Sequence, residues 1–180
     1  PQTNFNGGGS PGVAWTGGTV FTATAPASFG NCSGYQVSSV NLNFNHTWDS
    51  DLLIYIRNRR TGQVLGLSFA NGGSNDNFTN TKFCDNAACS PITAGAAPFS
   101  NTFRPQGAGG FICGTSPTAT LSTVASLAVV PNDVLELIFY DQAGGDSGRM
   151  LSWSVVMAAN PVLPVIPAAV TVSFAPGTCV

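Results

Sequence analysis

A strict alternation of apolar and polar residues over residues 40–48 constrains the fold more than any other feature of the sequence. Val40, Leu42, Phe44, His46 and Trp48 each stand next to an Asn or Thr. Because successive side chains of a β-strand point to opposite faces, a period of two indicates a strand with one buried face. The pattern predicts that these residues face a core, His46 and Trp48 included.

The same alternation recurs along the chain, and no segment has a convincing helical period. The further alternating runs lie at residues 52–56, 65–69, 135–139 and 151–157. Turn-forming clusters rich in Gly, Asn, Asp and Pro separate them, at residues 71–73, 131–133 and 144–146. Many short strands bounded by turn signals predict an all-β fold, a sandwich or jelly roll.

Charged residues are unusually scarce, at 8% of the 180 residues, against about a quarter in ordinary globular domains. A surface of Asn, Thr, Ser and Gly has little charge repulsion, which favours association. The only basic cluster is Arg57, Arg59 and Arg60. We interpret it as a solvated strand end, since nucleic acid binding requires a broad basic face. No apolar stretch reaches the length of a membrane span.

The five cysteines favour disulfides and therefore an oxidising compartment. Cys84 and Cys89 flank a short loop and are predicted to pair. Two of Cys32, Cys113 and Cys179 can form a second bond, for example Cys32 with Cys113. The third is then a free thiol or an intermolecular link, a role that suits Cys179 near the C-terminus.

Three Asn residues, Asn31, Asn45 and Asn77, stand in the N-glycosylation acceptor pattern. Each is weak evidence alone in a chain rich in Asn and Thr. Together with the cysteines and the low charge, they predict a secreted, extracellular glycoprotein.

A set of motifs falls in the order and spacing of one known family. The motifs are the His-Thr-Trp and Asp-Leu turn at residues 46–52, Arg-Thr-Gly at 60–62, and the segments at 72–78, 83–87, 98–105 and 152–154. Over residues 35–157 the chain resembles the P domain of furin- and kexin-like proprotein convertases. The resemblance implies a jelly-roll β-sandwich or barrel without catalytic residues, which in that family stabilises an attached protease.

The sequence also departs from that family. We expect no subtilisin-like catalytic domain before the module, since only about thirty-five residues of the sequence precede it; the strand at residues 134–137 lacks a tryptophan, and an extra arm follows. We therefore divide the chain into three parts. Residues 1–18 form a Gly/Asn-rich arm, residues 19–159 the P-domain-like module, and residues 160–180 a Pro-spaced apolar arm that ends in a strand.

Five aspartates lie in turns that the resemblance places near one another: Asp49, Asp51, Asp85, Asp141 and Asp146. Carboxylates suit Ca²⁺, and some P domains bind calcium, so these residues are predicted as a calcium site. The alternative is that they accept hydrogen bonds from backbone N–H groups of their turns.

No catalytic residues are predicted. Ser147 lies in a Gly-Asp-Ser-Gly segment, but the single histidine, His46, is expected in the core, and a serine nucleophile needs a positioned base. The single glutamate, Glu136, is expected on the outward face of its strand. Trp48 and Trp153 are expected in the core, which leaves Trp15 as the one plausible exposed platform for a ligand.

These observations favour a non-catalytic secreted structural subunit that assembles head-to-tail with copies of itself, into a fibre or surface layer. Its apolar C-terminal arm would insert into a neighbour. The arm residues expected to do so are Val165, Ile166, Val170, Val172 and Phe174. The alternatives are an accessory P domain of a secreted protease and a carbohydrate-binding jelly-roll module.

Overall fold

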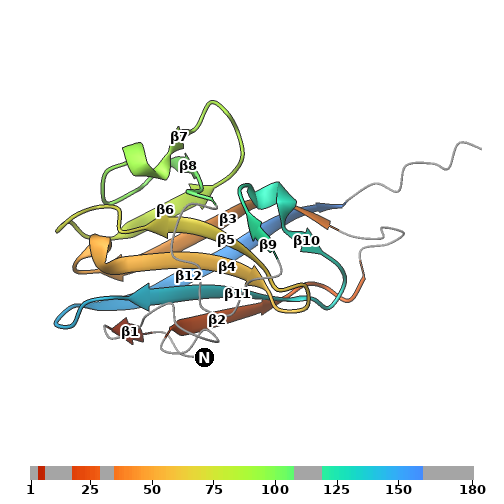
Figure 1. Ribbon diagram of the computed structural model, residues 1–180, viewed down its shortest axis with the longest axis horizontal. Helices are drawn as coiled ribbons and strands as arrows, with labels where there is room; N and C mark the ends of the chain where they lie inside the picture. Colours follow the sequence, from red (N-terminus) through yellow and green to blue (C-terminus); the bar gives the residue numbers. More distant parts are fainter. Residues whose placement is uncertain (1–3, 7–17, 29–34, 108–118, 160–180) are drawn as a thin grey trace, which may run out of the picture.

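The computed structural model describes residues 4–6, 18–28, 35–107 and 119–159 and has the all-β architecture that the alternation predicts. Two sheets lie face to face, with their strands running in similar directions (Figure 1). The only helices in the described part are short 3-10 turns: η2 (Asp49–Asp51), η3 (Ile92–Ala94) and η4 (Val124–Ser126). None of them is long enough to span a membrane.

The described strands are β1 (Asn4–Asn6), β2 (Thr19–Thr24), β3 (Tyr35–His46), β4 (Leu52–Asn58), β5 (Gln63–Phe69), β6 (Phe78–Phe83), β7 (Ser90–Pro91), β8 (Thr102–Arg104), β9 (Ala119–Leu121), β10 (Ala128–Val129), β11 (Val134–Asp141) and β12 (Ser147–Ala159). One sheet has the order β1-β12-β3-β6-β8-β7, and β10 also pairs with β3. The second sheet has the order β2-β11-β4-β5-β9. The long strands pair with one another antiparallel, whereas the short strands β9 and β8 run parallel to β5 and β6.

Aromatic rings join the two sheets. Phe44 of β3 stacks on Phe78 of β6 with ring centroids 4.7 Å apart. Across the interface it meets Phe139 of β11 edge to face, at 5.1 Å. All three rings are buried. Such geometries add stabilisation to that of buried area, and they fix the spacing between the sheets.

The second sheet is buried on both faces of its central strands β4 and β11. Ile54, Ile56 and Leu137 belong to the core between the sheets. Their alternate neighbours, such as Tyr55 and Ile138, form a second apolar cluster on the opposite face. These two strands therefore read as continuous apolar runs and not as an alternation.

The alternation in residues 40–46 is confirmed, since every second side chain from Val40 to His46 is buried. The expectation for Trp48 is wrong, because β3 ends at His46 and the turn that follows leaves this side chain 43% exposed. The expectation that Glu136 faces outward is also wrong. Glu136 is 4% exposed because both faces of β11 are covered.

The last strand, β12, runs along β3 for nearly the whole length of both strands. The register pairs Gly148 with His46 at one end and Ala159 with Tyr35 at the other. Two irregularities interrupt it, between Met150 and Ser152 and between residues 156 and 157. They are typical of β-bulges, which bend and twist a strand.

Replacing Phe44 by alanine should lower the free energy of unfolding by about 3–5 kcal/mol, since it opens a cavity at the contact between the sheets. Urea denaturation of the purified variant measures this loss. As a control, Thr22→Ala on the exposed face of β2 should change stability by less than about 0.5 kcal/mol. Equal losses in the two variants would contradict this description of the core.

Candidate functional site

The turn after β3 is tied to the loop that precedes β6. The Asp49 backbone N–H donates to the carbonyl of Asn75 at 3.0 Å, and the Asn77 N–H donates to Asp49 Oδ1 at 3.0 Å. Gly72 lies so close that an added Cβ would be 2.6 Å from the Cβ of Asp49, and its φ is +104°. Only glycine allows both this close approach and this positive φ. Gly72 therefore serves the packing of the loop against the turn.

His46 lies buried beside this turn and links it to the end of β11. Its Nε2 is 3.2 Å from Asp141 Oδ2. Its Nδ1 lies 2.9 Å from the Trp48 carbonyl and 3.2 Å from the Trp48 N–H. A proton on Nε2 would be donated to Asp141 and let Nδ1 accept the Trp48 N–H, whereas a proton on Nδ1 would be donated to the Trp48 carbonyl. The histidine therefore joins two segments far apart in the sequence.

Two buried carboxylate oxygens accept no hydrogen bond from the described residues: Asp49 Oδ2 and Asp141 Oδ1. Burial raises the pKa of Asp49 from 3.8 to about 7, against the lowering effect of the Asn77 N–H. Burial also raises the pKa of Asp141, and the hydrogen bond from His46 opposes that shift. Both carboxyl groups thus resist holding a negative charge.

Two other aspartates of the predicted calcium site have protein partners. Asp146 accepts a hydrogen bond from Thr47 Oγ1 at 3.0 Å. Asp85 accepts from the N–H groups of Val124 and Ala125, each at 2.8 Å, and so caps η4. Asp85 thus accepts backbone N–H groups, but those of a distant turn, and Asp146 accepts a side-chain hydroxyl, so neither makes the hydrogen bonds within its own turn that the alternative interpretation describes.

The unpaired oxygens of Asp49 and Asp141 fit a cation in part, because Ca²⁺ takes carboxylate oxygens as ligands. In the described ranges, however, no group of three or more His, Cys, Asp or Glu side chains is placed to hold a metal. Calcium binding at Asp49, Asp51, Asp141 and Asp146 stays a prediction, and Asp85 has a separate structural role.

The Gly-Asp-Ser-Gly segment lies at the start of β12, where the Ser147 side chain is exposed and its N–H donates to Thr47 Oγ1 at 3.3 Å. A serine–histidine pair would need Nε2 of the histidine to face the serine. In this fold Nε2 of His46 lies against Asp141. The absence of catalysis stays a prediction, and the geometry gives His46 a structural role.

At the other end of β4, the three arginines of the basic cluster are paired with two buried acids. Glu136 contacts both Arg57 and Arg59, at 2.5 and 2.6 Å. Asp133 contacts Arg60 at 2.5 Å and also accepts from Asn58 Nδ2 at 2.7 Å. The arginines therefore hold the end of β4 against the start of β11 and do not form a free basic face.

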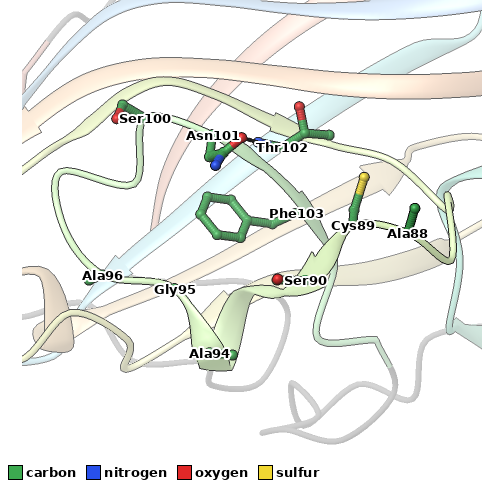
Figure 2. A pocket seen from close by; sticks show the side chains of 10 residues that line it. All are labelled: Ala88, Cys89, Ser90, Ala94, Gly95, Ala96, Ser100, Asn101, Thr102 and Phe103. Atoms are coloured by element: carbon green, nitrogen blue, oxygen red, sulfur yellow. Dashed lines mark hydrogen bonds between the residues drawn. The ribbon is translucent and has the colours of Figure 1, made fainter.

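The cysteine pair lies beside a cavity of about 450 Å³ between β7 and β8. The sulfur atoms of Cys84 and Cys89 are 3.7 Å apart as free thiols, so their predicted bond remains untested. Figure 2 shows Cys89 and the ring of Phe103 on the walls of the cavity, which carries no charged side chain. Nothing in this lining indicates a particular ligand.

Several predicted sites fall outside the described residues. These are the Trp15 platform, the acceptor Asn31, the cysteines Cys32, Cys113 and Cys179, and the arm residues Val165, Ile166, Val170, Val172 and Phe174. Of the remaining acceptors, Asn45 is exposed on β3. Asn77 is half-buried, and its Oδ1 accepts from the His46 N–H at 3.2 Å.

An apolar groove lies where the edges of the two sheets meet. We call it the edge groove. Its walls are residues 23–26 of the β2 end, Leu135 of β11 and residues 153–157 of β12, and its volume is about 560 Å³. No charged side chain lines it.

The edge groove exists because β12 lacks a full neighbour on one side. Among the described strands, only β1 pairs with that edge, and its partners on β12 are Ser147, Gly148 and Arg149. From Met150 onward, the side of β12 away from β3 has no described strand partner. Among the described residues, no strand takes up the outward-pointing N–H and C=O groups of this stretch, and an edge of this kind favours pairing with an added strand.

Burial changes sharply from β3 to β12. On β3, Val37, Val40 and Leu42 are 0%, 0% and 1% exposed. Their partners on β12 are Met157, Val155 and Trp153, which are only half-buried although they pack against the core. The interior side of β12 is thus incompletely covered, as expected for a sandwich edge without its next strand.

The sequence reasoning missed this groove. The alternation in residues 151–157 predicts a buried face for Trp153, Val155 and Met157 but does not tell an edge strand from a central one. Two signals were present in the sequence: polar residues on the other face of this strand, and the apolar arm that follows it.

Comparisons with family models, with curated proteins and with solved structures found no match to this chain. The resemblance to P domains therefore depends on the motifs in the sequence alone.

Stability should fall as pH rises from about 4 to 7, because the folded state keeps a proton on Asp49 that the unfolded state loses above pH 3.8. This contribution is complete below the unfolded pKa and is lost as pH reaches the folded value. Asp49→Asn, which is neutral at every pH, should flatten the profile of unfolding free energy measured in urea. Asp146→Asn, in a more exposed turn, should keep the wild-type slope. A wild-type profile that rises over this range would contradict the assignment.

Proposed function

We propose that this chain is a non-catalytic, secreted structural subunit. Copies of it assemble head-to-tail into an extracellular fibre or surface layer, by exchange of terminal strands between subunits. The sandwich provides the body of the subunit, and the C-terminal arm provides the connection.

The observation that carries this proposal is the open edge of β12 with its half-buried interior side chains. An edge strand with exposed backbone groups is a template for pairing with another chain. Natural proteins usually protect such edges with charges or Pro. Here the open stretch, residues 150–159, contains neither.

The charge distribution supports association. Only 8% of the residues are charged, and acids such as Glu136 and Asp133 are already paired with arginines. Little repulsion then opposes contact between copies. Steering by charge would be weak for the same reason, so specificity would come from shape and strand register.

We further propose that the sandwich is a jelly roll. The last two described strands, β11 and β12, lie beside the early strands β4 and β3 in opposite sheets. Pairing of late with early strands across two sheets is typical of Greek-key and jelly-roll topologies.

Two alternatives keep specific support. The motif resemblance favours an accessory P domain that stabilises a secreted protease.

The outward face of β3 carries Asn41 and Asn43 beside a surface cavity of about 300 Å³ that also includes Asn80. Amides suit the hydroxyl groups of sugars as hydrogen-bond partners, which favours carbohydrate binding as a second candidate function.

We also propose calcium as an accessory ion at the unpaired oxygens of Asp49 and Asp141. Added CaCl₂ would then raise the melting temperature at pH 8, and Asp49→Asn would remove that rise. An unchanged melting temperature in millimolar calcium contradicts a calcium site.

Deleting residues 161–180 should leave a folded sandwich and abolish higher-order assembly. Each apolar arm residue contributes roughly 1.5–3 kcal/mol on full burial, and the truncated chain loses this contact. Mass photometry and light scattering over a range of concentrations measure assembly, and thermal unfolding measures the fold. A full-length chain that stays monomeric at high concentration would reject the proposal.

Secreted material from a eukaryotic host should carry a glycan on Asn45, because its side chain is exposed on β3. Asn77 should carry one less completely, since its side chain is half-buried and bonded to His46. Glycopeptide mass spectrometry gives both occupancies. A bare Asn45 on secreted protein would count against the compartment that the sequence predicts.

A further inference from the structure

We infer that the edge groove is the acceptor site for residues 169–174 of a second copy of this chain. This inference rests on the proposed function and deepens it, because it names the surface that receives the arm, the segment that enters it and the side chains that fit.

The shape of the edge groove defines what it can accept. Its long wall is an open strand edge, so the occupant must offer backbone groups in an extended conformation. Its floor is made of apolar side chains, with Trp153, Val155 and Met157 on one side and Leu135 on the other. A strand with apolar residues on one face fits both features.

Residues 169–174 have that pattern. Val170, Val172 and Phe174 alternate with Thr171 and Ser173, and β-branched and aromatic residues favour strands. If this segment pairs with β12, Val170, Val172 and Phe174 would fill the groove, while Thr171 and Ser173 would face water. Residues 160–180 contain no charged side chain, which suits a groove without charges.

The segment between β12 and the donor strand favours a neighbour over the chain's own groove. Pro161, Pro164 and Pro167 follow one another at every third position. Proline fixes φ and disfavours helix in the residue before it, so this spacing predicts an extended, polyproline-like spacer. At about 3.1 Å per residue, such a spacer carries residues 169–174 about 30 Å beyond the end of β12.

A donor on one end and an acceptor along the edge form a head-to-tail contact. Each copy then gives one arm and receives one, and contacts of this kind that do not close into a ring make filaments.

The test uses paired variants of the full-length chain. Val155→Arg places a charge in the acceptor groove, and its control is Leu151→Arg on the same strand, which does not line the groove and whose side chain is 49% exposed. Val172→Arg disables the donor, and its control is Thr171→Arg on the outward face. The groove and donor variants should be monomers, and the controls should assemble like the wild type.

A mixture of the Val155→Arg and Val172→Arg chains shows whether the arm occupies the groove of a neighbour or that of its own chain. One intact groove and one intact arm remain in the mixture. The two variants should therefore form dimers that contain one copy of each and do not grow further. If the mixture stays monomeric and Val172→Arg lowers the melting temperature, the arm packs in its own groove and the inference is overturned. If Val155→Arg assembles like the wild type, the groove assignment fails while the proposed function survives.

A peptide of residues 165–176 gives a measurement that does not depend on the fold of the acceptor variant. It should bind the monomeric Val172→Arg chain and shift its tryptophan fluorescence, because Trp153 lines the groove. The same peptide with Val172→Arg should bind at least about tenfold more weakly, a difference of about 1.4 kcal/mol. Equal binding of the two peptides, or no binding, would overturn the inference.

Discussion

The pairing of β12 with β3 is the constraint on which the rest of the structure depends. Its register places Gly148 opposite His46 and so brings the turn after β11 to the turn after β3. The buried contact of His46 with Asp141 follows from that placement. The same pairing uses one edge of β12 and leaves most of its other edge without a described partner. One strand thus sets both the polar end of the sandwich and its apolar groove.

Four of the eight acidic residues are buried. Glu136 and Asp133 are nearly inaccessible, yet each has arginine partners, as buried charges require. Asp49 resists ionisation because burial raises its pKa. The buried acids join β4 to β11 and stabilise the two turns, whereas cations such as Arg59 and Arg60 stay exposed on a surface that carries few charges. Such a surface gives neighbouring copies little electrostatic reason to stay apart.

Sequence reasoning found the strands and lost accuracy where burial depends on neighbours. Residues 40–46 alternate because one face of β3 meets the core, so that strand was predictable. Trp48 was not, since the alternation in the sequence continues past the end of the strand. The expectation for Glu136 was wrong because alternation predicts exposure only when one face of a strand meets solvent, and both faces of β11 are covered. The groove required the order of strands in the sheet, which no local pattern contains, although the apolar arm that could fill it was visible.

The first irregularity in the pairing of β12 with β3 has a consequence for any strand that joins the free edge of β12. It adds Leu151 to β12, whereas the second adds Ser38 to β3, and a bulge shifts the direction of the backbone donors and acceptors on either side of it. Within β12, an even ladder therefore extends only over residues 152–159. A short added strand can pair along this stretch, while a longer one would meet the bulge at one end and the end of β12 at the other. A limit of this kind would let copies of the chain join one by one without the unlimited sheet growth that exposed edges otherwise invite.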